Sequence, residues 1–365
     1  MSALRRRPGM SNAEISRATK LAPQTVSLIV NSLTSLGLLE EAEPIRGKRG
    51  QPARPRLIRA DGAYSFGCEI SWKHVEIVLL DLAGTVIRSY HSDHDYPDAS
   101  LLIDEIANVI SQMRQTISEA QQSRIRGLGV AMPTEIWETL HRLDPPQDII
   151  EGWRETNVVE KFEQLTGLKT ELINDGSAAC RAEQSFGVGS GYPDLAYFFI
   201  SYFINGGLVI ANKIFNGPTG NSGNLGGILV LSRTGRSEYV HMIASLFALE
   251  NRYLEEDERR PDPNDIDGWV RPEVDTWVEE ASHALALAIA NCGAVVESPV
   301  AIIDGLFPHT IRDRLVARTS EIIKQLPNTI FEPPIILAGK VGHSAPAIGA
   351  ADTPIYLRYF ATEKT

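Results

Sequence analysis

The sequence predicts an α/β protein with a small N-terminal helical head and a large body, and three observations lead to this expectation. Two short amphipathic helical segments follow one another closely near the N-terminus. A basic segment rich in glycine and proline comes next. Beyond residue 60, apolar runs typical of strands alternate with helical periodicities, which favours a largely parallel sheet in each half of the body. With 365 residues the chain is long enough for two or three domains.

Residues 11–37 have the pattern of a helix-turn-helix. Ser11 and Glu14 predict a capping box, in which hydroxyl and carboxylate satisfy amides at a helix start, and this helix should run to about Thr19. Pro23 fits the first position of a second helix that ends at Gly37. The buried face of this second helix would consist of the apolar residues Val26, Ile29, Val30, Leu33 and Leu36. Two helices joined by so tight a turn are typical of a motif whose second helix enters the DNA major groove.

The opposite face of the second helix carries side chains that suit base recognition, namely Gln24, Thr25, Ser27 and Asn31. Gln and Asn can bond an adenine edge bidentately, and Thr or Ser can bond several bases. The basic segment that follows would lie along phosphates as a wing or reach into a minor groove. Its cations are Arg46, Lys48, Arg49, Arg54, Arg56 and Arg59. The alternative interpretation is a surface helical hairpin followed by a basic interdomain linker.

The charge of the chain is unevenly distributed. Residues 1–60 contain eleven Lys and Arg against four Glu, a net charge of +7, so the remainder carries −18 of the total of −11. A basic head on an acidic body confines polyanion binding to the head, and the partner we expect is a double-stranded DNA operator. Residues 1–10 include three arginines but are too few for a full helix before Ser11, and we expect them to be disordered.

Several other classes of function are not supported. No apolar run is long enough to span a membrane, and the N-terminus lacks the apolar core of a signal peptide. Cys68, Cys180 and Cys292 are far apart and odd in number, which excludes a disulfide framework or CxxC zinc pattern and favours the reducing cytoplasm. Two histidines and two aspartates in the loop 91–95 favour a solvated charge cluster over a metal site. We expect no metal and no cofactor. No G-x-S-x-G elbow supports nucleophilic catalysis.

Strands and helices alternate along the body. The expected strands are residues 64–70, 75–80, 125–132, 171–173, 195–203, 206–210, 300–303 and 335–337. The expected helices are residues 101–120, 160–166, 175–186, 278–296, 311–325 and 345–359. Residues 81–84 predict a hairpin turn and residues 216–227 a glycine-rich loop. The sequence has no repeat of fixed period, although the order of elements is compatible with a duplicated, two-lobed body.

Together these motifs resemble the ROK family, which groups sugar kinases with sugar-responsive transcription repressors. The head resembles that of the repressors, including the wing R-G-K-R-G-Q-P-A-R-P-R at residues 46–56. Gly127–Pro133 resembles the strand before the family's sugar turn, and Ile173-Asn174-Asp175 resembles the segment with the catalytic aspartate. The resemblance runs nearly end to end. It implies an actin-like, two-lobed ATPase fold of the ribonuclease-H type, with head and wing at 1–60, a first lobe at 61–175 joined by 344–365, and a second lobe at 176–343.

The departures from the family pattern concern phosphate and zinc binding. Where the family has a Gly-Thr-Gly-Ile-Gly type of phosphate segment, this chain has Ser-Tyr-Phe-Ile-Asn at 201–205. Glycines let backbone N–H groups approach phosphate, and we expect Tyr202 and Phe203 to fill that space. The family's Glu-x-Gly-His, which starts a zinc site, is Asn-Leu-Gly-Gly at 224–227, and no cysteine follows within reach. Phosphoryl transfer depends on positioning and charge neutralisation, so we expect no kinase activity.

Three residues of the family's sugar site remain as candidates for ligand binding. In the kinases the aspartate that matches Asp175 takes a proton from the sugar hydroxyl. Here Asp175, Asn174 and Asn224 could bond ligand hydroxyls without chemistry. The alternative for Asn174 and Asp175 is an Asx turn that caps the next helix and needs no ligand.

The leading hypothesis is a sequence-specific transcription regulator, a repressor that senses a sugar-like effector. It would bind a two-fold operator as a homodimer or homotetramer, and the effector would shift lobe closure and thereby the spacing of the heads. One alternative is a bifunctional ATP-dependent sugar kinase with a DNA-binding head. Another is a DNA-binding scaffold whose cleft has lost all recognition.

Overall fold

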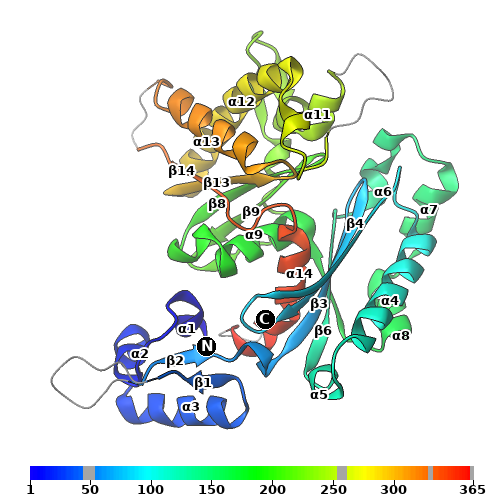
Figure 1. Ribbon diagram of the computed structural model, residues 1–365. Coiled ribbons are helices and arrows are strands. Elements are labelled where there is room, and N and C mark those ends of the chain that lie inside the picture. Colours follow the sequence, from blue (N-terminus) through cyan, green and yellow to red (C-terminus); the bar gives the residue numbers. More distant parts are fainter. Residues whose placement is uncertain (44–53, 253–260, 328–331, 362–365) are drawn as a thin grey trace.

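The computed structural model describes residues 1–43, 54–252, 261–327 and 332–361. It consists of the head, two lobes that each contain a five-stranded sheet, and a last helix between the lobes (Figure 1). The head lies beside the second lobe and the end of the last helix (Figure 1). The two-lobed arrangement expected for an actin-like fold is therefore present.

The head contains three helices and a small antiparallel sheet. These elements are α1 (Ser2–Arg6), α2 (Asn12–Thr19), α3 (Pro23–Ser35), β1 (Leu39–Glu41) and β2 (Arg56–Ile58). The capping box of α2 is confirmed, since the Glu14 N–H donates to the Ser11 hydroxyl and the Ser11 N–H donates to the Glu14 carboxylate. Helix α3 begins at Pro23 as predicted, and Gly37 follows it with a positive φ of 71°. The pair β1–β2 makes the head a winged helix-turn-helix.

The expectation that residues 1–10 are disordered is wrong. Residues 2–6 form α1, and Leu4 and Met10 are each 3% exposed in the core of the head. The Arg56 N–H donates to the Met10 carbonyl, which extends the small sheet to the N-terminal segment. Two apolar side chains and one backbone bond thus order a segment whose arginines alone suggested disorder.

The buried face of α3 is narrower than the sequence predicted. Val26 and Val30 are 1% and 2% exposed, whereas Ile29 is 43% and Leu36 is 67% exposed. At about 100° per residue, Ile29 and Leu36 lie roughly 60° and 80° around the helix from Val26. The head is too small to cover so wide an arc, and both side chains face solvent.

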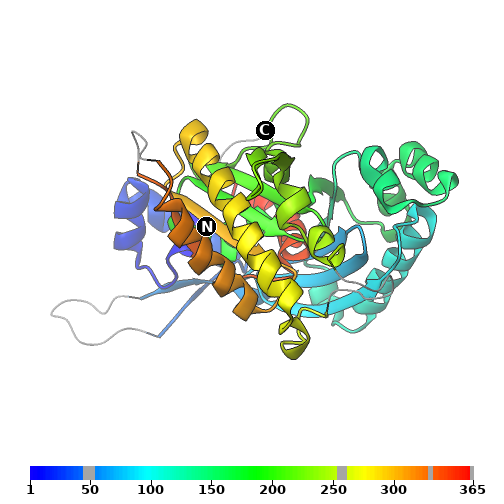
Figure 2. The same ribbon diagram turned by 90° about the horizontal axis from the view of Figure 1, so that it is seen from above.

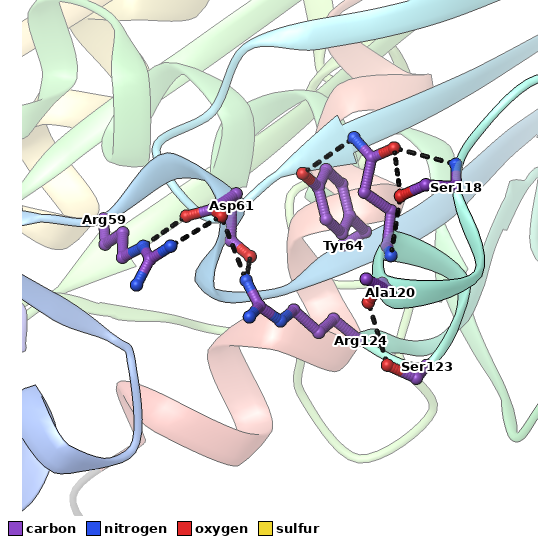
Figure 3. A network of polar contacts seen from close by, with 8 residues as sticks. Arg59, Asp61, Tyr64, Ser118, Ala120, Ser123 and Arg124 are labelled. Atoms are coloured by element: carbon purple, nitrogen blue, oxygen red, sulfur yellow. Dashed lines mark hydrogen bonds and ion pairs between the residues drawn. The ribbon is translucent and has the colours of Figure 1, made fainter.

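A polar network fastens the segment after the wing to the first lobe (Figure 3). The segment contains the 3₁₀ turn η1 (Ala60–Gly62). The Arg59 guanidinium donates to both oxygens of the Asp61 carboxylate, and Arg124 Nη1 donates to the carbonyl and the carboxylate of Asp61 at 2.7 and 3.0 Å. Gln121 donates to the Tyr64 hydroxyl at 3.2 Å. The sequence predicts Arg59 as one of the cations that lie along phosphates, but in the structure its guanidinium is part of this anchor.

The first lobe is built on a sheet with the strand order β5-β4-β3-β6-β7. The strands are β3 (Tyr64–Ile70), β4 (His74–Asp81), β5 (Val86–Asp93), β6 (Ile125–Met132) and β7 (Thr170–Asn174). The helices are α4 (Ala99–Gln115), α5 (Glu119–Gln122), α6 (Ile136–Thr139), α7 (Gln147–Glu155) and α8 (Val158–Thr166), with a 3₁₀ turn η2 (Leu140–Leu143). Helices α4 and α8 cover the outer side of the sheet (Figure 1).

The second lobe repeats this topology with the strand order β10-β9-β8-β13-β14. The strands are β8 (Leu195–Ile200), β9 (Ile204–Ile210), β10 (Lys213–Ile214), β13 (Val300–Gly305) and β14 (Ile335–Ala338). Helices α12 (Pro272–Val296) and α13 (His309–Ile323) lie side by side over one face (Figure 2), and α9 (Asp175–Phe186) packs on the other. Smaller elements are η3 (Val188–Gly191), η4 (Leu225–Gly227), β11 (Leu229–Leu231), β12 (Ser237–Tyr239), α10 (Val240–Ala244), α11 (Leu246–Glu250) and η5 (Asp267–Trp269).

Both sheets are mixed, which corrects the expectation of largely parallel sheets. In each lobe the first three strands pair antiparallel, and the last two join in parallel. Residues 71–73 join β3 to β4, and residues 201–203 join β8 to β9. Connections this short close hairpins, because a parallel crossover needs about a dozen residues or more. For the same reason the strand expected at 195–203 ends at Ile200.

The last helix, α14 (Ala345–Tyr359), is confirmed and connects the lobes. It packs on β3 and β6 of the first sheet and along α9. The approach is close, since a Cβ on Gly349 would lie 1.7 Å from the Ala178 carbonyl oxygen. The Ser65 hydroxyl on β3 donates to the Ala351 carbonyl. Movement between the first sheet and α9 must therefore involve α14. The domain boundaries 1–60, 61–175 with 344–365, and 176–343 stay predictions.

Cys68, Cys180 and Cys292 are buried and unpaired. Across the described residues, every helix is too short or too polar to cross a membrane.

Candidate functional site

The polar face of α3 is open to solvent. Gln24, Thr25 and Asn31 are exposed, Ser27 is half-buried, and Leu28 among them is 72% exposed. Within the described ranges, no hydrogen bond from another residue engages the amide or hydroxyl groups of Gln24, Thr25 or Asn31. These groups remain available to the edges of bases in a major groove.

The predicted phosphate contacts are only partly placed. Arg46, Lys48 and Arg49 lie outside the described residues. Arg54 and Arg56 both form ion pairs with Glu41 of β1, each at 2.7 Å. The Arg54 side chain is 66% exposed, whereas that of Arg56 is 14% exposed. Arg56 thus stabilises the base of the wing, and Arg54 is the more accessible cation.

A second polar site forms where β7 meets α9. Asn174 Oδ1 accepts from the Ser177 N–H at 3.1 Å and caps α9. Asp175 Oδ1 accepts from the Gly176 N–H at 2.9 Å, and its Oδ2 accepts from Asn205 Nδ2 at 2.6 Å. Asn174 therefore acts as the helix cap that the Asx-turn alternative predicts. Asp175 also bonds Asn205 at the start of β9.

Close backbone packing brings Asn205 to Asp175. A Cβ on Gly176 would lie 2.4 Å from the backbone nitrogen of Gly206, so α9 can approach β9 only because that residue is glycine. In the sequence, residues 201–205 are notable because they lack the family's glycines, and no pattern there predicts Asn205 as the partner of Asp175. Asn224, by contrast, is exposed at the start of η4, and in the described part of the chain no hydrogen bond joins its side chain to Asp175.

Two buried carboxyl groups share this region. Asp175 is 1% exposed, and burial, with a contribution from the nearby Glu69 carboxyl, raises its pKa to about 7 against the hydrogen bond from Asn205. Burial, with Glu76 adding to it, raises the pKa of Glu69 on β3 well above its usual range. A carboxyl that titrates near neutral pH can both donate and accept hydrogen bonds, which suits the recognition of hydroxyl groups.

Four aromatic side chains, called here the aromatic cluster, fill the space between the lobes. Trp72 comes from the first lobe, and Tyr202, Phe203 and Phe247 come from the second. The ring centroids of Trp72 and Phe203 are 5.5 Å apart, and those of Tyr202 and Phe203 are 5.1 Å apart. Tyr202 and Phe203 are 6% and 8% exposed and pack within the core of the first lobe. The hairpin between β8 and β9 is therefore inserted into the opposite lobe.

In the turn that carries Tyr202 and Phe203, three backbone polar groups are already hydrogen-bonded within the protein. The Ser201 N–H donates to the Phe203 carbonyl at 3.1 Å, and the Phe247 N–H donates to the Tyr202 carbonyl at 3.0 Å.

A polar contact borders the aromatic cluster, since Arg142 Nη1 and His241 Nε2 are 3.2 Å apart across the lobes. Burial and the nearby Arg142 lower the pKa of His241, so this pair is held by a neutral imidazole at neutral pH. In the described ranges, no three His, Cys, Asp or Glu side chains converge as metal ligands.

Comparison with protein families gives two matches. The ROK family matches residues 65–354, and a winged helix-turn-helix DNA-binding family matches residues 1–40. Among individual relatives, the xylose repressor of Bacillus subtilis (strain 168) is 25% identical over 225 residues. That match covers 60% of this chain and 56% of the repressor, so it spans little more than half of the repressor's length.

Two solved structures share the fold. A ROK family transcriptional regulator, a homologue of the E. coli MLC protein, has a TM-score of 0.66 at 18% identity and covers 95% of this chain and 92% of its own. A ROK family glucokinase from Streptomyces griseus, in complex with glucose and AMPPNP, has a TM-score of 0.61 at 19% identity, with 80% and 98% covered. The regulator match covers 95% of this chain and therefore extends into the head, whereas the 80% covered by the kinase match can leave the head out.

Proposed function

The chain belongs to the ROK family, and from this premise we propose that it is a sequence-specific DNA-binding transcriptional regulator of the repressor type. Its kinase-like body would sense a sugar or sugar-derived ligand. The match to a repressor named for xylose and the fold shared with a glucose-bound kinase support that ligand class. Its partner would be a double-stranded operator.

The single observation that carries the proposal is the open polar face of α3. Gln24, Thr25 and Asn31 point outward from a helix whose other face is buried by Val26 and Val30. Such a helix has its hydrogen-bonding groups directed at a partner and its apolar groups used for folding. Arg49 and Arg54 of the wing would add contacts to phosphates.

Selection of bound genomic fragments, followed by footprinting, tests DNA recognition. We expect a two-fold site with half-sites about one helical turn apart or a multiple of it, bound by a homodimer or homotetramer. Binding at moderate salt that shows no preference over competitor DNA would contradict the proposal.

We also propose that the body does not transfer phosphate. The support is the aromatic cluster, because Tyr202 and Phe203 occupy the segment where the family has glycines, and the Ser201 N–H is already bonded within the turn. A coupled ATPase assay over a panel of sugars should show no turnover above background. Sugar-dependent ATP hydrolysis would instead favour the bifunctional kinase.

Ligand sensing is tested separately by thermal shift with sugars and sugar acids, since a bound ligand raises the melting temperature by mass action. Asn174, Asp175 and Asn224 are the proposed contacts. The free, buried cysteines support a cytoplasmic setting for the regulator.

A further inference from the structure

Helix α3 carries one large apolar side chain in the middle of its polar face. At about 100° per residue, Leu28 lies roughly 180° around the helix from the midpoint between Val26 and Val30, the two buried residues of α3. Gln24 and Asn31 lie roughly 40° and 60° to one side of Leu28. Leu28 is 72% exposed and therefore points more directly away from the core of the head than either polar neighbour.

The fold of the head does not use this side chain. The buried core of the head consists of Leu4, Met10, Ile15, Val26, Val30 and Leu39. Helix α3 lies at the outer edge of the head, on the side away from the second lobe (Figure 1), and packs on α2 and β1. Single exposed leucines are common on protein surfaces. Leu28, however, lies at the centre of the face that a helix-turn-helix presents to the major groove.

The chemistry of the major groove limits what Leu28 can contact there. Base pairs present hydrogen-bond donors and acceptors in this groove, and the C5-methyl group of thymine is their one apolar substituent. A leucine placed over an amino group, a carbonyl or a purine N7 would exclude water from that group without replacing its hydrogen bond, which is costly. Over a thymine methyl group, two apolar surfaces leave water together, which is favourable. Thymine is therefore the base that this side chain favours.

We propose that Leu28 reads the C5-methyl group of a thymine in each half-site of the operator, an inference that rests on the proposed function. Its neighbours suit the same kind of base pair, because Gln24 and Asn31 can bond adenine bidentately. Along the helix axis they lie about 6 Å and about 4.5 Å from Leu28. Since base pairs are about 3.4 Å apart, the thymine should lie within about two base pairs of an adenine that these residues contact.

Replacement of single thymines by deoxyuridine tests the proposal, because deoxyuridine lacks only the methyl group. Operator fragments selected from genomic DNA carry one replacement in one half-site, and fluorescence anisotropy measures their affinity for the full chain. We expect one thymine whose methyl group contributes about fourfold to the affinity of the wild type, the effect of burying one apolar carbon. In Leu28→Ala the same replacement should have almost no effect, because the partner of the methyl group is missing.

Leu36→Ala is the matched control. Leu36 is also an exposed leucine, at 67%, but it lies at the C-terminal end of α3, roughly 12 Å further along the helix axis than Leu28. The Leu36→Ala variant should keep the fourfold difference between the thymine and deoxyuridine operators.

Two results would overturn the proposal and leave the proposed function standing. One is an equal loss of affinity for the thymine and deoxyuridine operators in Leu28→Ala, which would mean that Leu28 contacts something other than the methyl group. The other is an operator, bound with sequence preference, in which no thymine methyl group depends on Leu28. DNA binding without any sequence preference would contradict both proposals.

Discussion

Asp175 shows how one buried residue can make the stability of the fold depend on pH. Its carboxyl joins the start of α9 to Asn205 of β9, and its burial raises its pKa to about 7. An unfolded chain would titrate the same group near 3.8. Between these two values the folded state holds a proton that the unfolded state releases. This carboxyl therefore makes the folded protein less stable as pH rises from about 4 to about 7.

Asp175→Asn should remove that dependence. At pH 8 the variant should be more stable than the wild type by an amount on the order of a few kcal/mol, since each pKa unit corresponds to about 1.4 kcal/mol. At pH 4 the difference should nearly vanish. Urea unfolding across this range measures it, with Asp104→Asn on the exposed face of α4 as control. An unchanged pH profile would mean that folding does not raise the pKa of Asp175.

Base recognition is predicted at Gln24 and Asn31. Alanine at either position should cost about 1–3 kcal/mol of discrimination between the operator and single-base variants. Ser35→Ala, in the last turn of α3, is the control, because the Ser35 hydroxyl already donates to the Asn31 carbonyl within the helix. Competition gel shifts with substituted operators measure the effect. Equal losses on all sequences would mean that the two residues contact phosphates or support the fold.

At the scale of elements, local signals predicted more than long-range ones. The capping box at Ser11, the proline at the start of α3 and the periodicity of α14 act within a few residues, and each helix lies where expected. The pairing of β3 with β4 and the insertion of Phe203 into the opposite lobe depend on partners far away in the chain. An apolar run does not specify these partners, because parallel and antiparallel buried strands have similar composition.

The candidate site follows the same division. Asn174 and Asp175 were identifiable because they precede a helix in a recognisable motif. Asn205 and the pair Arg142–His241 carry no local signature, since each acquires its role only when the second partner is folded against it. The burial of Arg5 has the same cause, because its partner Asp352 lies on the last helix.

The aromatic cluster is predicted to hold the lobes together. Phe203→Ala should lower the free energy of unfolding by about 3–5 kcal/mol, since it removes a buried ring and leaves a cavity. Phe215→Ala, on an exposed ring of the same lobe, should change it by less than about 0.5 kcal/mol. Urea unfolding and small-angle scattering would measure stability and lobe separation. Similar effects of both variants would contradict an interlobe role for Phe203.

At the scale of the whole molecule, the charges of head and body oppose each other. A head at +7 on a body at −18 should bind DNA with a steep dependence on salt, because each neutralised phosphate adds about 0.9 to the slope of log affinity against log salt.

Arg54→Ala should reduce that slope by about 0.9, the value for one phosphate contact. It should weaken binding to specific and non-specific sites alike. Arg236→Ala, an exposed arginine on the second lobe, is the matched control and should leave the slope unchanged. Fluorescence anisotropy over a salt series gives both slopes. A reduction by Arg236→Ala as large as that by Arg54→Ala would place the DNA against the body.

The position of α14 has a consequence for biosynthesis. A ribosome releases the head first, yet Arg5 finds its carboxylate partner at residue 352, and β3 and β6 are covered only when residues 345–359 have emerged. Nascent chains would thus carry a helix-turn-helix that is joined to the first lobe through Asp61 and Arg124 but still lacks its contacts with α14. Synthesis of residues 345–359, rather than folding of the head, would establish the contact between the head and the last helix.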